Sequence, residues 1–143
     1  MKKTKLKPLL LFEEFWRCGT EQEETINTSE TARGNGCTRL LNEQGFMCCL
    51  GQFSMQLDET ITDRHLLSNV SPDSLNKLIP DLTYADHHID AHTNSMRRTI
   101  RNTSEVNEAI VINDDQNTTV KEKIKRLKNI LSKMGYDLIF VPR

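Results

Sequence analysis

Three histidines and two aspartates lie close together in the middle of the chain: Asp86, His87, His88, Asp90 and His92. Imidazole nitrogens and carboxylate oxygens are zinc ligands, and on a helix His88 and His92 would share one face. No second pair of ligands follows at a recognisable spacing, and the segment lacks the core-facing periodicity that would hold it rigid. We therefore expect a solvated loop and no metal site here. A metal-binding protein or small enzyme that uses His87, His88 and His92 remains an alternative.

A loop rich in arginine and glycine could bind an anion. Gly34 and Gly36 let backbone N–H groups converge on a phosphate, and Arg33 and Arg39 flank them with forked donors. Because the spacing matches neither a P-loop nor a dinucleotide fingerprint, a flexible turn is the competing interpretation. An aromatic ring could stack on a base beside this loop. The predicted ligand-binding residues are Trp16, Arg17, Arg33, Gly34, Gly36 and Arg39.

No motif of catalytic type stands out. Cys18, Cys37, Cys48 and Cys49 include no Cys-x-x-Cys pair, which argues against a zinc knuckle and a redox dithiol. The adjacent Cys48 and Cys49 cannot bridge each other without strain, so we expect all four cysteines to be thiols, as in a reducing cytoplasm. The sequence therefore predicts no catalytic residue and no cofactor, and an enzyme is the second hypothesis.

Two further polar clusters have simple structural interpretations. Lys121, Lys125 and Lys128 form a basic stripe on a predicted helix, with Lys123 beside it. Such stripes are usually solvated faces, and no aromatic residues interleave with this one as in nucleic-acid binding. The run that begins at Asn113 could bind a divalent cation, but asparagine and aspartate also bond their own backbone where one helix leads into the next.

Composition indicates one globular domain. The 143 residues are 36% hydrophobic and 27% charged, enough for a real core. The formal net charge of -1 gives no global field to attract nucleic acid or an anionic membrane. No run approaches the ~20 apolar residues that span a bilayer. Lysines before Leu9 imitate a signal peptide, but Glu13 and Glu14 end the apolar stretch early, so we expect a cytoplasmic protein.

The C-terminal segment has the clearest pattern of secondary structure. Apolar residues three and four positions apart predict a helix over residues 120–134. Thr119 and Glu122 form a capping box at its start, and Gly135 can adopt the left-handed conformation that ends it. Residues 136–141 are rich in β-branched and aromatic side chains and predict a strand.

Shorter patterns predict the remaining elements. Two apolar runs on either side of a turn at Asn42 predict a hairpin over residues 38–50, with Cys48 and Cys49 on opposite faces of one strand. A short helix follows this hairpin, another begins at Ser71, and a third covers residues 105–112 with Ser104 as its cap. Residues 20–36 predict a mobile loop, and residues 81–103 an irregular excursion.

Together these elements predict an α+β fold. Residues 1–143 form a single small domain with a short, largely antiparallel sheet, made from the hairpin and the C-terminal strand and packed with three to four helices. A strand near the start of the chain can join this sheet.

Several short motifs occur in order through both ends of the chain. They are Trp16-Arg17-Cys18-Gly19, a Gly-x-Met-Cys-Cys-Leu-Gly segment at residues 45–51, Asn113-Asp114-Asp115, and a last helix followed by Gly135 and Phe140-Val141. In this arrangement the chain resembles small uncharacterised accessory proteins of tailed phages and prophages. The resemblance does not cover residues 81–101. It implies the cytoplasm of a host cell and a counter-defence context, because such proteins often block host enzymes or immune systems.

The sequence and the resemblance together favour a non-enzymatic accessory protein. We expect it to bind and sequester a phosphorylated, nucleotide-derived ligand as a homo-oligomer, whose subunit boundary would supply basic side chains. An inhibitor that docks on a host protein is the alternative within the same class. The expected partners are thus a small anionic ligand or a host protein, and neither a membrane nor nucleic acid.

Overall fold

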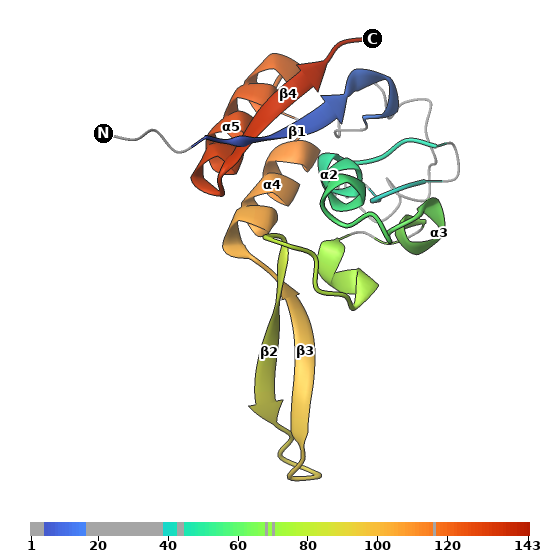
Figure 1. Ribbon diagram of the computed structural model, residues 1–143, viewed down its shortest axis with the longest axis vertical. Coiled ribbons are helices and arrows are strands. Elements are labelled where there is room, and N and C mark those ends of the chain that lie inside the picture. The colour runs from blue at the N-terminus through green and yellow to red at the C-terminus, as the bar shows by residue number, and fades with distance from the viewer. Residues whose placement is uncertain (1–4, 17–38, 43–44, 68, 70, 116) are drawn as a thin grey trace.

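The computed structural model describes residues 5–16, 39–42, 45–67, 69, 71–115 and 117–143. The predicted α+β class is confirmed: a helical body carries a short parallel sheet at one end and a projecting hairpin at the other (Figure 1). The predicted loop at residues 20–36 lies outside the described residues. None of the helices in the described ranges is long and apolar enough to cross a membrane.

The C-terminal strand pairs with the start of the chain, not with residues 38–50 as predicted. Strand β1 (Lys7–Phe12) and strand β4 (Tyr136–Val141) run parallel, in register from Lys7 opposite Tyr136 to Phe12 opposite Val141. The predicted antiparallel pairing is therefore wrong, although the N-terminal strand does join the sheet. Leu9, Leu11 and Leu138 are buried on the helical side. Their burial against the helices fixes this register.

The other edge of β1 is covered by side chains. Helix α2 (Cys49–Leu57) lies beside the strand, and its two glutamines bond the strand backbone as a neighbouring strand would. The Gln56 side chain accepts from Leu10 N–H and donates to the Leu10 carbonyl, both at 2.7 Å. Gln52 repeats the pattern at Phe12, at 2.8 and 3.2 Å. These bonds pair the backbone N–H and carbonyl groups of β1 that no strand in the described ranges pairs on this edge.

In place of the predicted hairpin at residues 38–50, the described residues 39–42 and 45–50 form a turn and no paired strands. Asn42 N–H bonds the Phe46 carbonyl at 2.9 Å, as the turn chemistry predicts. However, Leu41 bridges to Leu67, and α2 already begins at Cys49, so Cys48 and Cys49 are both buried at a helix start. Close packing of α2 explains this, because a Cβ at Gly51 would lie 2.0 Å from the Leu40 carbonyl oxygen.

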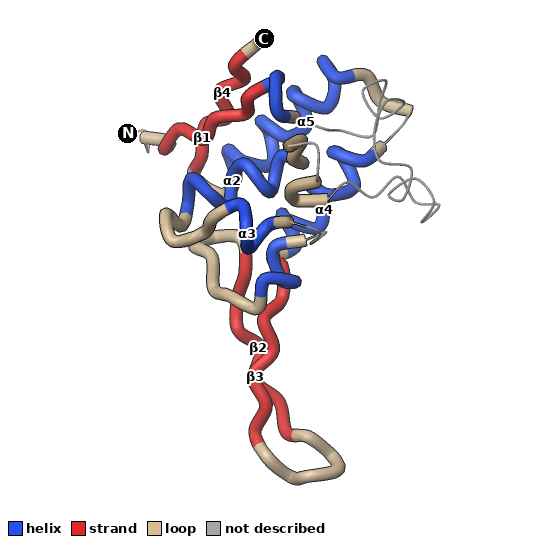
Figure 2. Tube along the Cα trace, turned by 90° about the vertical axis from the view of Figure 1, so that its right-hand side faces the viewer, coloured by secondary structure: helices blue, strands red, loops and turns tan. Residues whose placement is uncertain are grey.

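Residues 81–103 form a regular hairpin, so the predicted irregular excursion is wrong. Strand β2 (Thr83–Ile89) pairs antiparallel with strand β3 (Met96–Asn102). Figures 1 and 2 show the two strands projecting away from the helices. Apart from Thr83 and Ile100 near the root, no residue of the two strands is buried, so the apolar alternation that marks a packed strand is missing from the sequence.

The remaining helices follow the predicted positions with small differences. Helix α4 (Ser104–Asp114) is capped by Thr103 instead of Ser104, and the segment after Ser71 is a short 3-10 turn, η3 (Pro72–Leu75). A second such turn, η1 (Glu13–Phe15), and helix α3 (Asp63–Leu66) complete the body.

Helix α5 (Val120–Lys133) confirms the C-terminal prediction. The Thr119 hydroxyl accepts from Glu122 N–H at 3.2 Å, and Gly135 has φ +93° just after the helix. Both ends of this helix were therefore readable from single residues.

Candidate functional site

The predicted ligand-binding residues are only partly described. Arg17, Arg33, Gly34 and Gly36 lie outside the described residues, so the predicted anion site stays a prediction. Arg39 is partly exposed at the turn before α2. Its backbone carbonyl accepts from Cys48 N–H at 3.2 Å, which fixes this turn against the start of the helix.

Trp16 is a core residue. Its side chain is 1% exposed, and its ring makes a T-shaped contact with the ring of Phe140 at a centroid distance of 6.1 Å. Its indole N–H donates to the Asn113 side-chain oxygen at 2.8 Å. A ring enclosed in this way has no open face for a nucleotide base, so its role here is packing.

Asn113 joins three parts of the body. The same side-chain oxygen that accepts from Trp16 also accepts from Cys49 N–H at 3.1 Å, in the first turn of α2. It therefore caps α2 from another helix, since a first-turn N–H has no partner within its own helix. The Asn113 carbonyl accepts from the ammonium group of Lys123 at 2.8 Å. The Asn113-Asp114-Asp115 run is thus the predicted helix junction.

Lys123 does not share the exposed face of the predicted basic stripe. Lys121, Lys125 and Lys128 are exposed on α5, whereas Lys123 is fully buried. Its bond at the C-terminal end of α4 places a cation where the helix dipole favours one. The next junction residue, Asp115, accepts from the Thr118 hydroxyl and Asn117 N–H, and these bonds lower its pKa.

The root of the β2–β3 hairpin is anchored by side chains. The Thr83 hydroxyl accepts from Ile79 N–H at 2.7 Å and donates to the Lys77 carbonyl at 2.9 Å. On the partner strand, the Asn102 side chain accepts from Asp73 N–H in η3 at 2.8 Å. Ile100, on the next pair of this face toward the tip, is also buried, so the hairpin leaves the body in a fixed direction.

Asp81 and Asp58, which precede the hairpin, are also fixed by hydrogen bonds. The Tyr136 hydroxyl on β4 donates to Asp81, just before β2, and burial together with this bond raises the pKa of Tyr136 to about 12. Bonds from Thr60, followed by the Lys77 ammonium group 3.2 Å away, lower the pKa of Asp58. Both contacts tie the segment that precedes the hairpin to the body.

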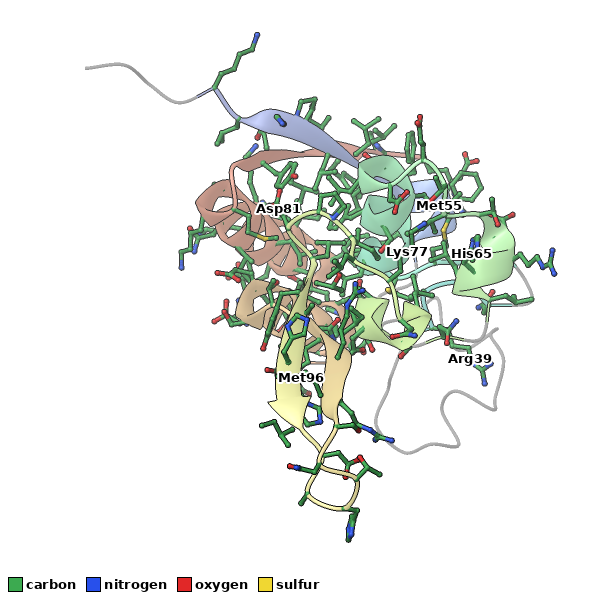
Figure 3. All side chains as sticks on the ribbon, turned by 60° about the horizontal axis from the view of Figure 1, so that its bottom comes forward. Arg39, Met55, His65, Lys77, Asp81 and Met96 are labelled. Carbon is green, nitrogen blue, oxygen red and sulfur yellow. The ribbon has the colours of Figure 1, made fainter. Side chains whose placement is uncertain are left out.

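The outer half of the hairpin, residues 86–99, is open to solvent. Ile89 and Met96 face each other across the last pair of the ladder and are 61% and 69% exposed. On the same face, the next pair toward the root is His87 opposite Arg98. Figure 3 shows Met96 and Arg39 apart, so the structure does not bring the hairpin tip together with Arg39.

The opposite face of the hairpin is charged but internally paired. Arg97 contacts Asp90 at 3.0 Å, and Arg101 contacts Asp86 at 2.8 Å. Asp90 also accepts from His92 N–H at 2.8 Å, which orders the tip, where Asn94 adopts φ +54°. The two ion pairs and this turn keep the ribbon regular to its end.

The histidines do not assemble into a metal site in the described part of the chain. Consecutive strand residues alternate between faces, so His87 and His88 point to opposite sides of the ribbon. No group of three or more histidines, cysteines, aspartates or glutamates there could hold a metal ion. The helical arrangement of His88 and His92 considered above is therefore wrong, because these residues lie in a strand and its turn.

Sequence reasoning missed the exposed pair at the tip. The sequence does contain a hairpin pattern, because Asp90 and Asn94 are typical turn residues between two short segments with β-branched side chains. The charged residues within those segments interrupt the apolar alternation by which strands are usually predicted. The Asn113 junction gave no such signal, since its partners are distant in sequence.

Comparisons with known proteins identified no relative of this chain. No protein-family model matches the chain, no curated protein matches it, and no solved structure matches it. The candidate site is accordingly defined by the contacts described above: an anchored root and an exposed outer half of the β2–β3 hairpin.

Proposed function

We propose that this protein is a non-enzymatic binding protein that docks on another protein through the outer half of its β2–β3 hairpin. One observation carries the proposal: a ribbon fixed at its root exposes two large apolar side chains, Ile89 and Met96, side by side at its far end. Exposing such a pair has a cost in water that burial against a partner removes. A preformed ribbon also loses little entropy when it binds.

The side chains around the tip favour a protein over nucleic acid. Methionine and arginine are enriched in protein interfaces, and the tip exposes Met96 and Arg98 on one face. By contrast, ion pairs with aspartates already engage Arg97 and Arg101. A ribbon that reads a phosphate backbone needs uncompensated cations along its length.

A non-enzymatic role fits the placement of the reactive groups. Cys48 and Cys49, which are the described thiols, are buried in the core, where a substrate does not reach them. The exposed groups of the hairpin are spread over two faces, and catalysis would need them to converge. This proposal corresponds to the protein-docking alternative from the sequence. The phage context, a host-cell cytoplasmic location and nucleotide sequestration stay predictions.

Site-specific photocrosslinking in bacterial cells tests the proposal. A photoreactive amino acid at Met96 should give adducts to protein, whereas the same group at Lys125, exposed on α5, should give few. Arg98→Glu should weaken the Met96 adducts, because it reverses a charge on the same face. Equal adducts from both positions, or adducts to nucleic acid alone, would contradict the proposed function.

A further inference from the structure

Helices α4 and α5 form an apolar hollow on the surface of the body. Its volume is about 370 Å³, and its lining consists of Asn107, Glu108, Val111, Ile112 and Ile130. Ile130 is buried at the floor, whereas Val111 is 68% exposed at the rim. The hollow is thus an aliphatic surface with a carboxylate at its edge, and it is separate from the hairpin.

The side chains at the hairpin tip are complementary to the hollow in both hydrophobicity and charge. Ile89 and Met96 match the aliphatic lining, and Arg98 lies next to them on the same face. Glu108 at the rim, with Glu105 one turn earlier on α4, provides the opposite charge. Apolar and charged groups therefore match in kind between the tip and the hollow.

Resting on the proposed role of the hairpin, we infer that the hollow between α4 and α5 receives the hairpin tip of a second copy of this chain. A hairpin cannot fill the hollow of its own chain, because β3 leads directly into α4 and the two extend from their junction in roughly opposite directions (Figures 1 and 2). The occupant must therefore come from another molecule. A second copy is suitable because each copy has both a tip and a hollow.

The dimensions allow both contacts to form at once. From Asn102 to Met96 the strand reaches ~20 Å, at ~3.3 Å per residue. From Ser104 to Val111 the helix advances ~10 Å, at ~1.5 Å per residue. Two copies with antiparallel hairpins and roots offset by ~10 Å would place each tip at the other hollow. A twofold axis relates the two contacts, so the assembly closes as a dimer and does not grow into a filament.

Sedimentation velocity over a range of concentrations tests this inference. The full chain should dimerise, and Met96→Glu and Val111→Glu should each raise the dissociation constant at least about tenfold, since each buries a charge in the apolar contact. Both positions are exposed in one copy, so both variants should fold. Arg98→Glu should weaken the dimer, and adding Glu108→Arg in the same chain should restore it.

Two results would overturn the inference: a wild-type chain that stays monomeric at every concentration, or a dimer that Val111→Glu leaves intact. Photocrosslinking from Met96 separates this failure from failure of the proposed function. If the chain is monomeric but Met96 still gives adducts to another protein, only the dimer is wrong. If Met96 gives no protein adduct at all, both proposals are wrong.

Discussion

The body and the hairpin treat polar side chains in opposite ways. In the body, Asn113 and Lys123 are buried, and the Asn113 side chain bonds Trp16 and Cys49 from distant parts of the chain. On the hairpin, Arg97 and Arg101 pair with Asp90 and Asp86 of the same ribbon, and both faces of its outer half are open to solvent. The same kinds of residue therefore hold the fold in one region and present a surface in the other.

This difference shows that residue type alone does not identify a site. Trp16 resembles a base-stacking residue in sequence but is enclosed in the core, whereas Met96 resembles a core residue but is 69% exposed. The position of each residue in the fold, and not its type, determines its role. Substitutions in the body should therefore lower stability, whereas substitutions in the outer hairpin should weaken binding.

The largest effect should come from Gly51→Ala. The added Cβ would lie 2.0 Å from the Leu40 carbonyl oxygen, which belongs to the backbone and cannot swing away. We expect a loss of about 3 kcal/mol or more in the free energy of unfolding. Urea denaturation measures it. Gly135→Ala is the control, because that site is strained by its φ of +93° but has open space, and it should cost only about 1–2 kcal/mol.

A second substitution in the body, Asn113→Ala, should destabilise the junction. It removes the oxygen that both Trp16 and Cys49 N–H groups share, in a buried place that water does not easily reach. A loss of about 2–3 kcal/mol is expected by thermal or urea unfolding. Asn129→Ala, exposed on α5, is the matched control. Equal melting of the two variants would show that the junction is unimportant.

A smaller effect is expected where the body meets the hairpin root. In the fold the pKa of Tyr136 is raised from 10.0 to about 12, so the protonated hydroxyl is favoured. Its contribution is complete below pH 10 and is lost as the pH rises from 10 toward 12. Tyr136→Phe should lower stability by about 1 kcal/mol at neutral pH and flatten this alkaline decline. An unchanged alkaline profile in the variant would exclude the Tyr136 contribution.

The sequence predicted most reliably the elements whose ends are set by single residues. Helix α5 follows from its apolar spacing, the Thr119 cap and Gly135. The parallel pairing of β1 with β4 could not be predicted in the same way, because it joins the two ends of the chain and depends on Gln52 and Gln56 at the opposite edge. Long-range contacts of this kind leave no local pattern.

The candidate site was harder to predict than the fold. A packed strand reveals itself by alternation, but the outer β2–β3 hairpin packs on nothing, so its sequence looks irregular. Conversely, the adjacent Cys48 and Cys49 suggested a strand because their residue types fit one, whereas Gly51 allows a helix to approach the Leu40 backbone there. Tertiary packing decided both outcomes.

The most direct test of the account is the stability of a chain with a shortened hairpin. Replacing residues 87–98 with an Asn-Gly turn removes Ile89, Met96 and the outer ion pair but keeps Thr83, Ile100 and Asn102 at the root. At concentrations where the full chain is monomeric, urea denaturation should give a free energy of unfolding within about 1 kcal/mol of the full chain, because the removed side chains bury little. A shortened chain that fails to fold, or loses several kcal/mol, would contradict the claim that the outer hairpin serves binding and not the fold.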